Sequence, residues 1–178
     1  MNGDIRLLNS QDARAFRKLR LFALQESPAA FGSSYEEEAP TPVSVMEERL
    51  KPIGNPPERF SLGAFSKENE LVGIAFFLRQ TKKKERHKGW IYGIYVSPEA
   101  RGAGFGKRLM VEVIQRAQIL PGLRQINLSV VASMDAAHGL YKSLGFQTYG
   151  VEKDGYFIDS KYYDIEFMAM KIQAASHQ

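Results

Sequence analysis

Three glycines within five residues form the most chemically suggestive segment of the chain. Residues 101–107 read Arg-Gly-Ala-Gly-Phe-Gly-Lys, between a strand-like apolar run (Trp90–Val96) and a stretch with helical periodicity (Gly106–Leu120). Without side chains, successive amide hydrogens can converge on an anion at a helix N-terminus, where the helix dipole also favours negative charge. Lys107 and Arg108 in the first helical turn oppose that dipole unless a phosphate lies there. The segment predicts a phosphate-binding turn.

The glycine spacing excludes two common phosphate-binding loops. The dinucleotide-binding fingerprint requires a third glycine at the position of Lys107, and the nucleotide P-loop requires Gly and Ser or Thr at the positions of Arg101 and Arg108. The segment instead fits Arg-x-x-Gly-x-Gly, formed by Arg101, Gly104 and Gly106. A glycine-rich turn between a strand and a helix, without any ligand, is the alternative interpretation of this segment alone.

The elements that must position this turn follow from the hydrophobic pattern. Strands are predicted at Asp4–Leu8, Arg59–Phe65, Leu71–Arg79, Trp90–Val96, Ile126–Val130, Phe146–Val151 and Tyr162–Ile172. Helices are predicted at Asp12–Gln25, Ser44–Lys51, Gly106–Leu120 and Met134–Leu144. The crossover from Trp90 to Val131 pairs two strands in parallel. The fold class is therefore α/β, a mixed sheet of about seven mostly antiparallel strands with a central parallel pair and about four helices.

Two details of this pattern concern the ends of the chain. The first helix is expected to bury a stripe made of Ala15, Leu19, Phe22 and Ala23. The last two strands are expected to form a hairpin with a long connection between them.

A second patterned segment lies about thirty residues after the glycine turn. It reads Ala137-x-x-Leu140-Tyr141-x-x-x-Gly145-Phe146. In this order, the two segments closely resemble the recurrent motifs of the GNAT superfamily of N-acyltransferases, and the order of the predicted elements resembles it too. The resemblance runs from Ile5 to about Ile172. It implies one GNAT domain over residues 1–178, with a core at about 4–172.

The resemblance implies an N-acetyltransferase that moves an acetyl group from acetyl-CoA to a primary amine of a small molecule or peptide, with no metal. The positions matching the family's acetyl-CoA site are Ile94, Tyr95, Val96, Arg101, Gly102, Ala103, Gly104, Phe105, Gly106, Lys107 and Tyr141. In the family, the strand before the glycine turn splays from its parallel neighbour and its free amides contact the acyl carbonyl. Val96 or Ile94 would supply that amide here, and Tyr141 would be the general acid for the departing thiolate.

The sequence departs from the family pattern at two places. Met134 stands where an asparagine often binds the pantetheine arm, and Tyr92–Gly93 stand where many relatives have a basic glutamate. Candidates for the general base are Glu26, Glu36 or Asp164, each of which also fits a solvated surface charge. A neutral amine with a chain of waters is one alternative, and a non-catalytic acyl-CoA-binding regulatory protein on the same fold is another.

The irregular segment from Glu26 to Pro57 occupies the place of the family's acceptor-binding wall. Phe31, Tyr35 and Glu36 are predicted to contact a cationic amine through aromatic faces and negative charge, with Tyr92 as a further substrate contact. The neighbouring glutamates, Glu37 and Glu38, fit a solvated loop better. The sequence does not identify the amine.

Composition limits the other function classes. The chain of 178 residues suits one domain, and its lack of cysteine excludes disulfides, thiol nucleophiles and cysteine-ligated metals. His87, His138 and His177 show no metal or triad spacing. No signal-like or membrane-length apolar run is present, so we expect a cytoplasmic protein without a membrane partner. The net charge of +4 lies within residues 82–88, which favours a solvated hairpin tip over a nucleic-acid contact; a homodimer stays open.

Overall fold

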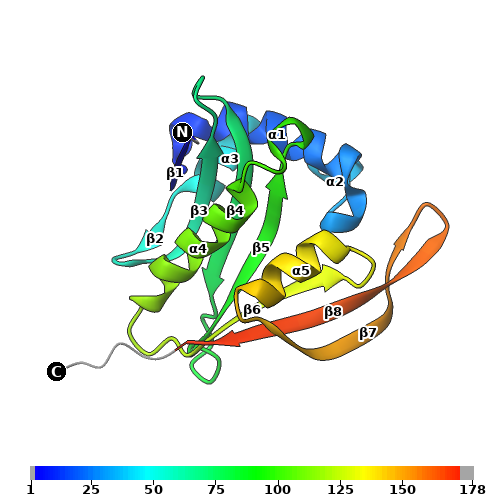
Figure 1. Cartoon of the computed structure of the whole chain (residues 1–178). Helices are drawn as coiled ribbons and strands as arrows, with labels where there is room; N and C mark the ends of the chain where they lie inside the picture. The colour runs from blue at the N-terminus through cyan, green and yellow to red at the C-terminus, as the bar shows by residue number, and fades with distance from the viewer. Residues whose placement is uncertain (1–2, 173–178) are drawn as a thin grey trace.

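The computed structural model describes residues 3–172 and contains one mixed sheet with helices on both faces (Figure 1). The strands are β1 (Asp4–Leu7), β2 (Ile53–Gly54), β3 (Pro57–Phe65), β4 (Leu71–Arg79), β5 (Lys88–Val96), β6 (Gln125–Val131), β7 (Gln147–Ile158) and β8 (Lys161–Lys171). The helices are α1 (Ala13–Glu26), α2 (Tyr35–Glu38), α3 (Val43–Leu50), α4 (Phe105–Gln118) and α5 (Asp135–Ser143). None of the described helices is long and apolar enough to cross a membrane.

The sheet has the order β1-β3-β4-β5-β6-β8-β7, with β2 paired to the free end of β3. Every neighbouring pair is antiparallel except β5 and β6, which the helix α4 connects in parallel. The predicted mixed sheet with a central parallel pair is therefore confirmed. The short elements α2 and β2 were not predicted, because a helix of one turn and a two-residue strand are too short to show a period.

The two faces of the sheet carry separate apolar clusters. On one face, α4 packs Leu109, Met110 and Val113 against the side chains of β3, β4 and β5. On the other face, α1 and α3 cover Ile74 and Tyr95. The apolar periodicity of each helix matches the sheet face that it covers.

The buried stripe of α1 differs from the predicted one. The structure buries Ala13, Phe16, Leu19, Arg20, Ala23 and Leu24, whereas Ala15 is exposed and Phe22 is 44% exposed. Phe16 packs edge-on against Phe76 of β4, with ring centroids 5.5 Å apart. The prediction was right for Leu19 and Ala23 and wrong for Ala15 and Phe22, because the buried face of α1 is centred on the side of the helix that carries Phe16 and Arg20.

The hairpin at the end of the chain has a tight turn, so the predicted long connection is wrong. β7 and β8 remain paired up to Ile158 and Lys161, and Asp159 and Ser160 form the turn with φ values of 49° and 62°. This ribbon projects beyond the rest of the sheet (Figure 1). Its outer part is largely exposed, and it carries aromatic side chains such as Phe157 and Tyr162, which are 62% and 64% exposed. Main-chain pairing continues there without the alternation of apolar and polar residues from which strands are predicted.

The central parallel pair is short, and the two strands separate beyond it. β5 and β6 are paired only from Lys88 to Trp90 and from Gln125 to Asn127, after which the strands diverge (Figure 1). The buried Asn127 side chain donates a hydrogen bond to the Gly89 carbonyl, 3.3 Å away, at the last point of pairing. Beyond it, β5 is paired with β4 and β6 with β8, so the sheet is open between them.

Candidate active site

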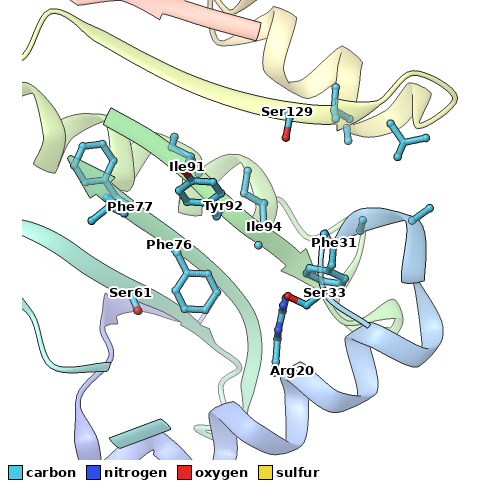
Figure 2. Close-up of a pocket in the computed structure, with 18 of the residues that line it drawn as sticks. Arg20, Phe31, Ser33, Ser61, Phe76, Phe77, Ile91, Tyr92, Ile94 and Ser129 are labelled. Atoms are coloured by element: carbon cyan, nitrogen blue, oxygen red, sulfur yellow. The ribbon is translucent and has the colours of Figure 1, made fainter. Parts of the chain in front are cut away.

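A cavity of about 560 Å³ lies where β5 and β6 separate. Its walls come from both faces of the sheet, because α5 contributes Tyr141 and Ala137 on one side and α1 contributes Arg20 on the other. Figure 2 shows Phe76 and Phe77 of β4, Tyr92 and Ile94 of β5 and Ser129 of β6 around the space between them. The cavity therefore joins the two faces through the gap in the sheet.

The glycine turn lies beside this gap, at the start of α4. Gly102 and Gly104 have φ values of 79° and 81°, a region that residues with side chains rarely adopt. Nothing lies within 4 Å of the position that a Cβ would take at either residue. A Cβ at Gly106 would lie 3.6 Å from Leu140 of α5 and 3.8 Å from Val96 of β5. The turn thus exposes bare main chain to open space between β5 and α5, as an anion-binding turn requires.

The remaining residues of the turn differ in how far their side chains are exposed. Lys107 and Ala103 are exposed, whereas Phe105 is buried in the core under α4, so its side chain faces away from the open side. Arg108 donates from Nη2 to the carbonyl of Gly3 at 2.7 Å. Of the two basic residues in the first turn of α4, Lys107 is therefore the exposed one.

The backbone of β5 is irregular where it borders the gap. Its register with β4 shifts between the pairs Ile74–Tyr95 and Phe76–Tyr92, and Gly93 has a φ of 57°. Ser97 N–H donates to the Val72 carbonyl at 2.8 Å, on the side of β4. Because amide directions alternate along a strand, the N–H of Val96 points the opposite way, toward the gap.

Tyr141 of α5 lines the cavity and is only 6% exposed. Its ring packs against Phe146, with centroids 6.3 Å apart, and its hydroxyl makes no hydrogen bond with a described residue. Burial raises the pKa of Tyr141 above its ordinary value. The phenol therefore keeps its proton at neutral pH, so the hydroxyl can donate a hydrogen bond.

Arg101 connects the glycine turn to the end of α1. Its guanidinium donates to both carboxylate oxygens of Glu26, at 3.0 and 2.7 Å, and to the Val96 carbonyl at 3.1 Å. Its own N–H donates to the Pro98 carbonyl at 3.2 Å, and the Tyr95 hydroxyl donates to Glu26 at 3.0 Å. The Arg101 side chain is thus occupied within the protein.

None of the carboxylates considered as a base lines the cavity. Arg101, together with the hydroxyls of Ser27 and Tyr95, lowers the pKa of Glu26 to about 2, which makes it a weak base. Asp164 on β8 is ion-paired with Lys153 at 2.6 Å. Glu36 is exposed on α2, outside the cavity.

The carboxylate that does line the cavity is Glu38, which the sequence analysis had assigned to solvent. It accepts hydrogen bonds from Arg20 at 3.2 Å and Arg49 at 3.1 Å. Glu37 instead caps the N-terminus of α2: its carboxylate accepts a hydrogen bond from the Ser34 N–H, and its own N–H donates one to the Ser34 hydroxyl. Successive side chains of a helix point about 100° apart, so three adjacent glutamates cannot share one direction.

The predicted acceptor contacts divide into two pairs. Phe31 and Tyr92 line the cavity, and Phe31 lies under the Arg20 guanidinium, 4.4 Å from ring centroid to Cζ. Tyr35 packs against the cluster under α1 and, like Glu36, is not part of the cavity wall. The charged side chains of the cavity wall are Arg20, Arg49 and Arg59 around Glu38, and the predicted contact Glu36 is not among them.

Sequence reasoning missed the arginines of the cavity, namely Arg20, Arg49 and Arg59. The signal for Arg20 was its position four residues after Phe16, on the helix face that is otherwise apolar. Residues 3–172 contain no cluster of three or more His, Asp or Glu side chains that could hold a metal ion.

The sequence matches a known family and known proteins. The model of the Acetyltransferase (GNAT) family matches residues 21–146. A mycothiol acetyltransferase from Paenarthrobacter aurescens (strain TC1) is 35% identical over 125 residues, which are 69% of this chain and 38% of that protein. The uncharacterized N-acetyltransferase YesJ from Bacillus subtilis (strain 168) is 28% identical over 58% of this chain and 62% of its own length. The chain thus spans less than two thirds of either curated relative.

Solved structures share the fold. A GNAT superfamily phosphinothricin acetyltransferase from Sinorhizobium meliloti, in complex with acetyl-CoA, superimposes with a TM-score of 0.83 at 22% identity, over 99% of this chain and 91% of that one. A ribosomal-protein-alanine N-acetyltransferase from Brucella melitensis has a TM-score of 0.76 at 23% identity, over 95% and 99% of the two chains. Since the family model covers most of the sequence and the fold agrees, the chain belongs to the GNAT acetyltransferase family.

Proposed function

We propose that this chain is an N-acetyltransferase that moves an acetyl group from acetyl-CoA to a primary amine of a small molecule or peptide. The observation that carries the proposal is the divergence of β5 from β6 beside a turn of bare main chain. The divergence opens a path for an extended thioester, and the turn offers amide donors for its diphosphate. The structural relative bound to acetyl-CoA supports the same choice of acyl donor.

The donor would lie on the side of the sheet covered by α4 and α5. Its diphosphate would meet Gly102, Gly104 and Gly106, and its pantetheine arm would follow the gap toward Tyr141. Lys107 is exposed beside the turn and can add a positive charge. The Arg101 side chain would act indirectly, by holding the turn against Glu26.

The transfer itself would be a direct attack within the cavity. The nitrogen of the amine forms a bond to the carbonyl carbon of the thioester, which gives a tetrahedral oxyanion. The Val96 N–H, which points into the gap, would donate to that oxyanion; removing such a donor costs about 3 kcal/mol in other enzymes. Collapse of the intermediate breaks the C–S bond, and the Tyr141 hydroxyl would donate its proton to the departing thiolate.

The amine would enter as its neutral form, because no uncommitted carboxylate lines the cavity. Glu38 is the carboxylate of the described wall, and both of its oxygens are held by arginines. The proton released from nitrogen would therefore pass to water, and a proton from water would restore the Tyr141 phenol after the thiolate has taken its proton.

The test is a thiol-release assay of the purified protein. Acetyl-CoA is mixed with alkylamines, polyamines, amino acids, amino-acid amides and short peptides, and free CoA thiol is measured against a blank without amine. Amine-dependent release, with the acetylated amine identified by mass spectrometry, is the expected result. If acetyl-CoA binds but no amine releases thiol, the protein is instead a non-catalytic acyl-CoA-binding regulator, which the lack of a free carboxylate in the cavity would then explain.

A further inference from the structure

The end of the cavity away from α5 is positively charged. Its described wall contains Arg20, Arg49 and Arg59 against Glu38, an excess of two positive charges, and neither lysine nor aspartate nor histidine. These side chains come from α1, α3, β3 and α2, on the sheet face opposite α4. The glycine turn and Tyr141 belong to the α4 face, so the arginines lie apart from the place proposed for the diphosphate.

Arg20 is the most deeply placed of these groups. It is 9% exposed, and Figure 2 shows its side chain extending from α1 toward Phe31 and Ser33. Its Nη1 would lie 3.7 Å from a Cβ placed on Gly93, so the guanidinium sits beside the irregular part of β5. That backbone borders the gap where the thioester is proposed to lie.

The positive charge in this pocket is only partly balanced. Burial lowers the pKa of Arg20, against the opposing effect of Glu38, so holding the guanidinium charge there is costly. Arg20 makes one hydrogen bond in the described structure, to Glu38, and the same carboxylate is also ion-paired with Arg49. The Nε atom of Arg59 is buried without a hydrogen-bond partner among the described residues. Buried arginine donors without partners are suited to a second anion.

We propose that the acceptor is a small amine that also carries an anionic group, a carboxylate or a phosphonate-like group, and that Arg20 binds this anion. The inference rests on the proposed function, because it concerns the acceptor half of the same cavity. Arg20 lies close to β5, so the anion and the reacting amine are only a few bonds apart in the acceptor, as in amino acids and aminoalkylphosphonates. Phe31, which stacks on the guanidinium, keeps it in place.

The first experiment uses the unaltered protein and matched acceptors. Values of kcat/KM from thiol release are compared for L-amino acids, their uncharged amides, 1-aminoalkylphosphonates and simple alkylamines. We expect the anionic acceptors to exceed the amides by about tenfold or more, since a charge-assisted bond in a desolvated pocket is lost in the amide. The amide has the less basic amine and hence more neutral nitrogen, so intrinsic reactivity favours it. Whichever of the two anionic classes, carboxylates or phosphonates, has the larger kcat/KM identifies the anion that the pocket prefers.

The second experiment assigns the effect to Arg20. Arg20→Gln should lower kcat/KM for anionic acceptors by about ten- to a hundredfold and leave the amides within about threefold. Calorimetric affinity for acetyl-CoA should not change, and Arg20→Lys should restore part of the loss. Arg14→Gln, on the exposed side of the same helix, is the matched control and should behave as the wild type.

The outcomes separate the two proposals. Preference for amides or alkylamines over their anionic counterparts would overturn the anionic acceptor while leaving an acetyltransferase. Equal losses for anionic and neutral acceptors in Arg20→Gln would reject Arg20 as the anion-binding group. No thiol release with any amine would reject the proposed function itself. If Arg20→Gln does not fold, the comparison of acceptors on the wild type still decides the acceptor class.

Discussion

At the scale of single residues, Tyr141 combines burial with an unoccupied hydroxyl. The side chain contributes its ring to the core beside Phe146 and lines the cavity, and its hydroxyl makes no hydrogen bond with a described residue. A tyrosine that served packing alone would gain nothing from this hydroxyl, because a buried polar group without a hydrogen bond costs free energy. Its retention is explained if the hydroxyl meets the sulfur of the thioester.

Tyr141→Phe separates these two roles. We expect kcat to fall by about ten- to a hundredfold, because the thiolate would leave without its proton donor, with acetyl-CoA affinity and Tm nearly unchanged. Thiol-release assays measure kcat, and calorimetry measures the affinity for acetyl-CoA and the Tm. Tyr149→Phe, on the exposed part of β7, is the control and should keep full activity. Undiminished kcat in Tyr141→Phe would assign this residue to packing.

At the scale of elements, the ion pair between Glu26 and Arg101 joins the C-terminal end of α1 to the loop before α4. It connects the helix that carries Arg20 with the turn that carries Gly104, although the two residues of the pair are far apart in sequence. The pair also orients Tyr95, whose hydroxyl donates to Glu26. The pair therefore couples α1 on one face of the sheet to the glycine turn before α4.

Glu26→Gln should weaken this connection in a pH-dependent way. The pKa of Glu26 is lowered from 4.5 to about 2, so the folded state gains stability from the pair above about pH 4.5 and loses it as the pH falls toward 2. At pH 7 we expect a loss of only about 1 kcal/mol, or about 2–4 °C in Tm, because Arg101 is 47% exposed. At pH 2 the Tm difference from the wild type should vanish.

Glu48→Gln is the matched control for this measurement. Glu48 of α3 pairs with Lys51, which directly follows the same helix, and both side chains are exposed, so this ion pair connects no distant elements. Its Tm should stay close to that of the wild type at both pH values. A Tm difference for Glu26→Gln that stays constant from pH 7 to pH 2 would show that the side-chain amide perturbs packing and that the ion pair contributes nothing.

At the scale of the whole molecule, the site exists because one sheet opens in its middle. Neither sheet face alone encloses the cavity: α5 closes it on one side, and α1 with the segment before α3 closes it on the other. β5 and β6 are not paired beyond Trp90 and Asn127, so a ligand that fills the gap would contact both strands and join them. Binding should therefore stabilise the whole fold.

Acetyl-CoA at a hundred times its Kd should raise the stability by about 2.7 kcal/mol, which corresponds to a Tm increase of about 5–10 °C for a chain of this size. Gly104→Glu should abolish the increase, because its carboxylate would lie where the diphosphate binds. Gly104→Ala suffers the same backbone strain at φ 81° without the negative charge, so it serves as the control. An equal Tm increase in Gly104→Glu would place the diphosphate elsewhere.

Much of the fold could be predicted from the sequence, because its signals are local. The types and spacing of neighbouring residues suffice to predict the strand that ends at Val96, the glycine turn at residues 102–106 and the apolar stripe of α4. The left-handed φ values at Gly102 and Gly104 agree with the demand for glycine at those positions. The resemblance of two short motifs to the GNAT superfamily then sufficed to expect the mixed sheet and the parallel pair.

The charged wall of the cavity could not be predicted, because it depends on tertiary structure. Arg20 and Glu38 are 18 residues apart in the sequence, and Arg59 follows later in β3. The three side chains meet only because α1 and α2 pack on the face of the sheet to which Arg59 of β3 points. The segment before α3 lacks a period, so side-chain directions in it depend on contacts with α1 and not on spacing. The sequence by itself therefore determined the glycine turn and the order of strands and helices around it, while tertiary packing decided which charges face the cavity.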